Sequence, residues 1–153
     1  MTFSLVARCA ETGLFGVAVA SSSPAVAARC AHARAGVGAV ASQNVTDPLL
    51  GTRGLDLMAA GASAAEAVAI LARTPHAAFR QVLAVDRDGN TAIHSGPKAL
   101  GLWAEAREHD VASGGNLLAH EGVPRAVVDG FLGSSGPLGD RLIAAMCAGM
   151  SAG

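Results

Sequence analysis

The pattern of apolar positions opens with two short runs joined by a polar turn. Residues 2–9 and 14–21 are mostly apolar or small, and the turn between them contains Gly13. Glycine adopts the positive φ angles that tight turns require, so this segment is predicted to form a β-hairpin. Neither run alternates strictly between apolar and polar residues, which indicates strands covered on both faces. We therefore expect the strand that begins at Thr2 to be central in the fold.

The rest of the chain alternates between blocks of strands and pairs of helices. A capping box at Ser63 and Glu66 marks one helix start, and Asp88-Gly89 marks a hairpin turn. The predicted elements are a connector at 25–34 with room for one helical turn, a strand at 36–43, helices at 47–61 and 63–74, strands at 80–86, 91–95 and 109–118, and helices at 124–132 and 138–150.

This order predicts one α+β domain over residues 1–153. Runs of strands followed by pairs of helices favour a four-layer αββα sandwich, in which two antiparallel sheets stack face to face. Strands and helices in separate runs argue against a parallel Rossmann fold, which needs a crossover helix after each strand.

Composition narrows the function classes. Hydrophobic residues make up 51% of the chain and charged residues 15%, and the net charge is −1. No basic stripe is present, which argues against nucleic-acid binding, and no apolar run reaches the length of a membrane span. Arg8 is the first charged residue, so the basic start of a signal peptide is missing.

The cysteines and histidines give no sign of a metal or a cofactor. Three cysteines are present without a C-x-x-C motif, and the five histidines lack a ligand spacing such as H-E-x-x-H. Buried thiols in a reducing cytoplasm are the expectation, with no metal site and no cofactor.

The first residues also carry candidate chemistry. If Met1 is removed, Thr2 holds both a hydroxyl and a free α-amine, whose pKa in a model peptide is about 7.7–8.0. Such an amine can take the proton of its own hydroxyl and serve as a general base. With Met1 attached, the nitrogen of Thr2 is an amide and cannot do so. Thr2 as an ordinary strand residue is the structural alternative.

An ordered series of motifs runs along nearly the whole chain. It comprises Thr2-Phe-Ser-Leu-Val-Ala-Arg, Glu11-Thr-Gly, Gly16-Val-Ala-Val-Ala-Ser-Ser, Ala33-Arg-Ala-Gly-Val-Gly-Ala-Val-Ala-Ser-Gln43, Gly54-Leu-Asp-Leu and Gly115-Asn-Leu-Leu118. The series resembles the bacterial family called domain of unknown function 1028, in the N-terminal-nucleophile (Ntn) hydrolase superfamily. This resemblance implies an Ntn-hydrolase-like αββα sandwich and gives Thr2 the roles of nucleophile and base. It implies no particular substrate.

The function expected from this resemblance is hydrolysis of a small amide or acyl compound through an acyl-enzyme on Thr2. The alternative is a non-catalytic ligand-binding or structural module on an Ntn-like fold. An Ntn mechanism also needs donors for the oxyanion. Asn116, which follows Gly114-Gly115, is the first candidate donor, and Asn44 at a strand end is the second. Alternatively, Asn116 only satisfies local backbone groups.

Two arginines are candidates for the positive charge that an Ntn site places near its nucleophile. Proteasome-type members of the superfamily place a lysine near the nucleophile, but this chain has none in the matching region, so Arg29 or Arg34 would have to substitute. Buried pairing with a carboxylate is the alternative role of either arginine. Ser21 and Ser22, at the end of the second strand, are read either as the edge of the site or as a simple turn.

The sequence at the C-terminal end predicts that the sandwich lacks some of its strands. Residues 149–153 read as a flexible tail where the family pattern would add strands and helices, so the sandwich is expected to lack its C-terminal strands. The helices at 62–73 and 138–150 carry few charges, and helices that are apolar on most sides are normally buried. We therefore expect a homo-oligomer, with a two-fold dimer as the default.

Overall fold

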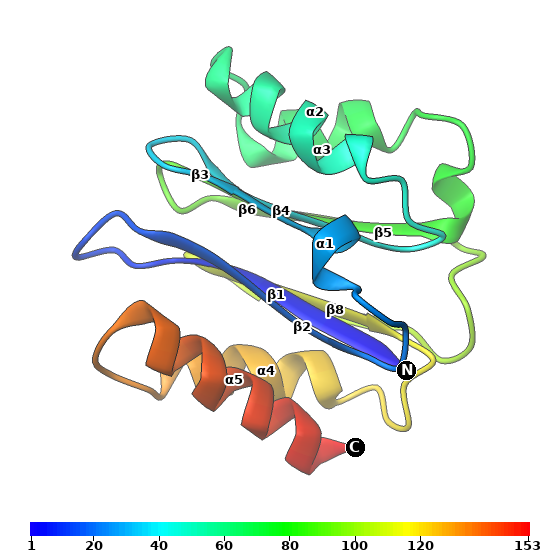
Figure 1. The fold of residues 1–153 in the computed structure, drawn as a ribbon, viewed down its shortest axis with the longest axis vertical. Coiled ribbons are helices and arrows are strands. Elements are labelled where there is room, and N and C mark those ends of the chain that lie inside the picture. Colours follow the sequence, from blue (N-terminus) through cyan, green and yellow to red (C-terminus); the bar gives the residue numbers. More distant parts are fainter.

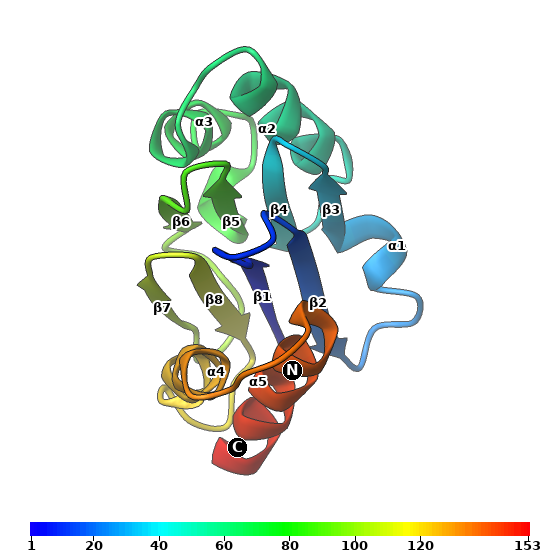
Figure 2. The same ribbon diagram turned by 90° about the vertical axis from the view of Figure 1, so that its left-hand side faces the viewer.

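The computed structural model describes residues 1–153 and shows four layers: a helix pair, two stacked sheets and a second helix pair (Figure 1). One sheet has the strand order β2-β1-β8-β7 and the other β3-β4-β5-β6, with antiparallel neighbours throughout. Helices α2 and α3 cover the outer face of the second sheet, and α4 and α5 cover that of the first (Figure 2). The predicted α+β class with two antiparallel sheets is confirmed.

The elements have the following bounds. The strands are β1 (Thr2–Arg8), β2 (Phe15–Ser21), β3 (Ala31–Arg34), β4 (Gly38–Asn44), β5 (Arg80–Asp86), β6 (Thr91–Ser95), β7 (Ala104–Glu108) and β8 (Val111–Asn116). The helices are α1 (Ala27–Cys30), α2 (Leu49–Ala59), α3 (Ala64–Leu71), α4 (Val123–Leu132) and α5 (Leu138–Ala152), and a short 3₁₀ turn covers Ala77–Phe79.

Strand β1 is central, as predicted. It pairs with β2 on one side and β8 on the other, and its residues from Phe3 to Ala7 are fully buried. Successive side chains of a strand point to opposite faces. Accordingly, Phe3 and Leu5 pack under α4 and α5, whereas Val6 packs between the two sheets with Leu83. Burial on both faces explains why the β1 sequence does not alternate.

The predicted capping box of α3 is confirmed. The Ser63 hydroxyl accepts a bond from the Glu66 N–H, and a Glu66 carboxylate oxygen accepts one from the Ser63 N–H at 2.8 Å. The Ser63 N–H and the Ser63 hydroxyl, which both donate to the Glu66 carboxylate, lower the pKa of that carboxyl. Asp86 at the end of β5 accepts the N–H of Ala64 at 2.9 Å, which ties the start of α3 to the underlying sheet.

Two strands are missing from the sequence prediction. β3 lies inside the segment predicted as a connector, and β7 was not predicted at all. Both are edge strands with the sequences AHAR and AEARE, and both are only partly buried. Alanine, glutamate and arginine do not favour strands by themselves, so the extended conformation here comes from pairing with β4 and β8.

The packing between the sheets yields a stability test. Leu83 is fully buried there. We expect Leu83→Ala to lower the free energy of unfolding by about 2–5 kcal/mol, because it removes buried methyl groups and leaves a cavity. Ile143→Ala, at a side chain that is 65% exposed, should change it by less than about 0.5 kcal/mol. Urea unfolding measures both, and an equal loss in the two variants would contradict the described core.

Candidate functional site

Thr2 lies where three strand ends meet. In the antiparallel sheet the first residue of β1 is paired with the last residue of β2, Ser21, and with the last residue of β8, Asn116. The hydroxyl oxygens of Thr2 and Ser21 are 2.8 Å apart and share a hydrogen bond. The register of one strand with its two neighbours therefore gathers these three polar side chains.

A cavity of about 220 Å³ opens at this edge. Six of the seven site residues predicted from the sequence line it: Thr2, Ser21, Ser22, Arg29, Asn44 and Asn116. The other lining residues are Met1, Ser23, Val26, Gln43, Thr46, Leu100 and Leu117. The structure thus brings together residues that lie more than one hundred positions apart in the sequence.

Arg34 does not belong to this group, so its predicted place beside Thr2 is corrected here. Its guanidinium lies 2.8 Å from the Asp56 carboxylate in an exposed ion pair. Arg34 pairs with Gly38 at the start of β4, whereas Asn44, which lines the cavity, is at the end of that strand. Arg34 is therefore at the opposite end of the sheet, and its pairing with a carboxylate is exposed rather than buried as the alternative had it.

Arg29 is held at the cavity by neutral partners. Its guanidinium donates to the Pro24 carbonyl and to the Ser23 hydroxyl, both at 2.8 Å. No carboxylate lies within ion-pair distance of it. Arg29 is the only charged side chain among the lining residues.

Gln43 forms the first part of a buried polar network beneath the cavity. Its amide nitrogen donates to Gln81 Oε1 at 3.1 Å and to the Gly114 carbonyl at 3.0 Å. Its amide oxygen accepts from the Ser4 hydroxyl at 2.6 Å. An amide nitrogen has only two hydrogens, so Gln43 has no donor left for a ligand.

Gln81 on β5 continues this network to Asn116. The Gln81 amide nitrogen donates to Ser95 and to the Gly115 carbonyl, both at 3.1 Å, and its oxygen accepts from Asn116 Nδ2 at 3.0 Å. Both amide hydrogens of Gln81 donate hydrogen bonds, whereas only one of the two amide hydrogens of Asn116 does so here. Among these three buried amides, Asn116 alone retains an N–H that can serve a ligand.

Gln81 was missed in the sequence analysis. Part of the signal was present, because Gln81 stands directly before the apolar run from Val82 to Val85, and the structure buries all seven residues of this strand. Buried polar side chains are almost always hydrogen-bonded, so such a residue indicates a partner elsewhere in the core.

Asn44 has an unusual backbone and an unused acceptor. Its φ is +73°, a left-handed conformation that is uncommon outside glycine. Its side-chain nitrogen donates to the Phe79 carbonyl, and its side-chain oxygen is buried without a hydrogen-bond partner. Asn44 lines the cavity, but this oxygen is itself shielded from solvent.

Met1 covers part of the site. It lines the cavity, and its carbonyl accepts a bond from the Ser22 N–H at 3.3 Å. In this form the Thr2 nitrogen is an amide. Removal of Met1 would vacate the space beside Thr2 and leave the α-amine of Thr2 next to its own hydroxyl.

The comparisons with known proteins address the chain as a whole. The model of a family of unknown function, DUF1028, matches residues 2–153. The chain belongs to this family. Among solved structures, this family member is similar to the crystal structure of protein SPO2555 from Silicibacter pomeroyi, which is assigned to the same family. The TM-score is 0.94 and the identity 28%, over 99% of this chain and 71% of the other. No curated protein matches this family member.

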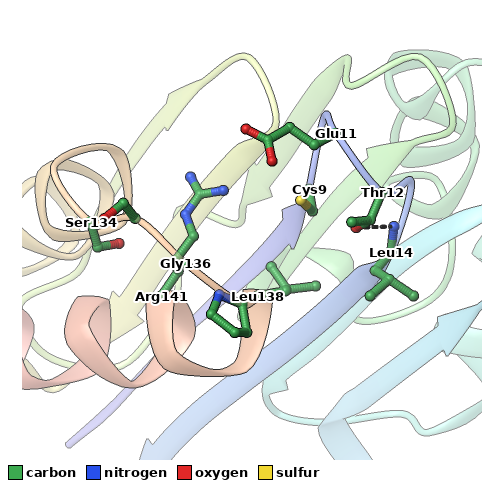
Figure 3. A pocket seen from close by; sticks show the side chains of 10 residues that line it. Cys9, Glu11, Thr12, Leu14, Ser134, Gly136, Leu138 and Arg141 are labelled. Carbon is green, nitrogen blue, oxygen red and sulfur yellow. Dashed lines mark hydrogen bonds between the residues drawn. The ribbon is translucent and has the colours of Figure 1, made fainter.

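A larger cavity, of about 610 Å³, lies at the other end of β1 (Figure 3). Cys9 and Thr12 line it from the first hairpin turn, and Arg141 lines it from α5. Hydrogen bonding to Thr12 lowers the pKa of the Cys9 thiol, yet Cys9 is only 5% exposed. No histidine or amine lines this cavity, and its one carboxylate, Glu11, makes no hydrogen bond to the Cys9 thiol. The cavity at Thr2 therefore remains the better candidate, although it is smaller.

The remaining cysteines and acidic groups suggest no further chemistry in this family member. Cys30 is buried, which raises the pKa of its thiol to about 11, and Cys147 is exposed. No group of three or more His, Cys, Asp or Glu side chains is arranged to hold a metal ion. None of the helices is both long enough and apolar enough for a membrane crossing.

The buried network can be tested through stability. Gln81→Leu removes partners from the amides of Gln43 and Asn116 and from the Gly115 carbonyl. Since each unsatisfied buried group costs about 1–3 kcal/mol, we expect urea unfolding to show a loss of at least about 2 kcal/mol. Ser95→Ala should cause a smaller loss, about 1–3 kcal/mol, because it leaves only one N–H of Gln81 without its partner. A Gln81→Leu protein as stable as wild type would show that the network adds nothing to the fold.

Proposed function

We propose that this protein is an Ntn-type hydrolase that cleaves a small amide or acyl compound through the Thr2 hydroxyl. The observation that carries the proposal is the position of the Thr2 hydroxyl in a cavity, bonded to Ser21 and directly across the strand pair from Asn116. The four-layer arrangement of the two sheets and helix pairs is consistent with an Ntn-like fold, which is part of the same proposal.

The proposed reaction begins after removal of Met1. The neutral α-amine of Thr2 takes the proton of its own hydroxyl, and the oxygen attacks the substrate carbonyl carbon. The carbonyl electron pair moves to the oxygen and then returns, which expels the leaving amine with the proton from the ammonium. A water molecule, deprotonated by the same amine, attacks the resulting ester, so the acid departs and Thr2 is restored. No cofactor enters these steps.

Asn116 supplies the oxyanion donor in this proposal. Its unspent amide N–H can bond to the negative oxygen of the tetrahedral intermediate, while Gln81 fixes the other N–H and therefore the plane of the amide. Gln81 is in this sense a positioning residue. Ser21 orients the Thr2 hydroxyl, and Ser22, Asn44 and Arg29 contact the bound substrate.

The second candidate is a non-catalytic ligand-binding or structural module on the same fold. It applies if Met1 stays attached, because the Thr2 nitrogen is then a peptide amide and cannot act as a base. The homo-oligomer and the cytoplasmic location remain predictions alongside either function. For the oligomer, Ile143 and Met150 expose apolar surface on the outer side of α5.

The first test concerns Thr2 itself. Intact mass of protein expressed in bacteria should lack one methionine residue, and a β-lactone probe should acylate Thr2. Thr2→Ala should abolish the labelling, while Thr12→Ala, at the opposite end of β1, should be labelled like wild type. Quantitative retention of Met1, or undiminished labelling of Thr2→Ala, would favour the non-catalytic module.

The second test concerns the oxyanion donor. Loss of one such donor typically lowers a rate by about 10²–10³-fold, so Asn116→Ala should slow acylation of Thr2 by the β-lactone by this order. Circular dichroism and urea unfolding establish that the variant is folded. A folded Asn116→Ala protein that is acylated at the wild-type rate would exclude Asn116 from the mechanism.

A further inference from the structure

We infer that the Thr2 site takes small substrates that carry a free carboxylate, and that Arg29 binds this carboxylate. The inference rests on the proposed hydrolysis at Thr2, because it assigns the substrate class of that site. It comes from the charge of the cavity, the bonding of Arg29 and the hydrogen-bonded path between Arg29 and Thr2.

The cavity carries a single sign of charge. Among its thirteen lining residues Arg29 is the only ionised side chain, and no Asp or Glu is present to neutralise it. A protonated α-amine on Thr2 would add a second positive charge once Met1 is removed. A recess lined by one sign of charge concentrates ligands of the opposite sign, so this cavity favours anions.

Arg29 has donors to spare. The arginines at 8, 34, 80 and 125 each lie within ion-pair distance of a carboxylate, but Arg29 has only a carbonyl and a hydroxyl as acceptors. A guanidinium carries five N–H groups, and two of them are used here. These two bonds hold the planar group in place while three donors remain, which suits two-point binding of a carboxylate.

The bonding path ties Arg29 to the nucleophile. Ser23 accepts from Arg29 through its hydroxyl, and its backbone N–H donates to the Ser21 hydroxyl at 3.0 Å. That same Ser21 hydroxyl is bonded to Thr2. Arg29 and Thr2 therefore belong to one continuous rim, and one small molecule can reach both.

The size of the cavity limits the ligand. With Met1 attached, its volume of about 220 Å³ is below the range of about 300–1,000 Å³ that is typical of sites for drug-sized molecules, and removal of Met1 would enlarge it only by the space of that one residue. The lining is mostly hydroxyl and amide groups, with three apolar side chains, Val26, Leu100 and Leu117, besides Met1. The substrate class is thus a short amide with one free carboxylate, such as the monoamide of a dicarboxylic acid. The alternative role of Arg29 is only to brace the loop at 22–26.

Binding to a catalytically inactive protein tests this inference independently of turnover. Thr2→Ala protein is titrated by calorimetry with glutaramate, which carries an amide and a carboxylate, and with the neutral glutaramide. We expect glutaramate to bind at least about tenfold more tightly, as charge-assisted bonds to a carboxylate would give. Adding Arg29→Gln should remove the difference, whereas adding Arg53→Gln, at an exposed arginine on α2 away from the cavity, should preserve it.

The outcomes separate the two proposals. Equal affinity for the two compounds, no measurable binding of either, or a preference that survives Arg29→Gln in a folded protein would overturn the inference. If Arg29 only braces the loop, Arg29→Gln weakens both compounds alike or neither. A third outcome is that glutaramate binds, but the Met1-free wild type neither hydrolyses it nor is labelled by the β-lactone. The carboxylate site would then stand, and the proposed hydrolysis would be wrong.

Discussion

The pairing of β1 with both of its neighbours is the constraint on which the rest of the molecule depends. Because β2 and β8 both run antiparallel to β1, its first residue must meet their last residues, and its last residues must meet their first. The same register places Phe3 and Leu5 on the helix side and Ser4 and Val6 on the sheet side. A slip of one residue would exchange these two faces, so the core and the site edge are fixed together.

Below the Thr2 cavity, the space between the two sheets is filled by polar side chains instead of apolar ones. Gln43 and Gln81 are fully buried, and every donor they own is used. Saturated amides in a medium of low dielectric constant hold one geometry, since any alternative leaves a group unpaired. The bond to Gln81 holds the Asn116 amide in one orientation, and the second N–H of Asn116 stays free to donate to a ligand. Preorganisation of this kind is what stabilisation of a developing charge requires.

Local signals gave most of the fold, and what they missed are two edge strands of weak strand propensity. The bounds of β5 and β6 were predicted correctly because an apolar run, an Asp-Gly turn and a second run occur in sequence order. β3 and β7 each pair with the strand that directly follows, β4 and β8, but the sequences AHAR and AEARE hold few residues that favour strands, so these hairpins were missed. In the site, Asn116 stands out in the sequence beside two glycines, whereas the partners of Gln81 on β8 are brought to it only by the fold. Arg34 was misplaced because the composition of a strand does not say which end of a sheet its residues reach.

The glycine pair at positions 114 and 115 has a mechanical consequence. Gly114 leaves bare backbone toward the facing sheet, where a Cβ would meet Leu83, and Gly115 faces Phe3 and Leu118 on the other side of β8. The Gln43 and Gln81 amides reach the carbonyls of these two glycines from the facing sheet. A Cβ added at Gly115 would lie 3.0 Å from the Thr2 carbonyl oxygen. Apolar surfaces in contact tolerate sliding because their attraction has little direction, whereas these bonds break under it. The two sheets are therefore held against shear at the edge that carries Thr2 by buried amides, and at the opposite edge by bonds between β6 and β7, where the Thr91 hydroxyl donates to the Glu108 carbonyl at 2.9 Å and Arg107 donates to the Thr91 carbonyl at 2.6 Å.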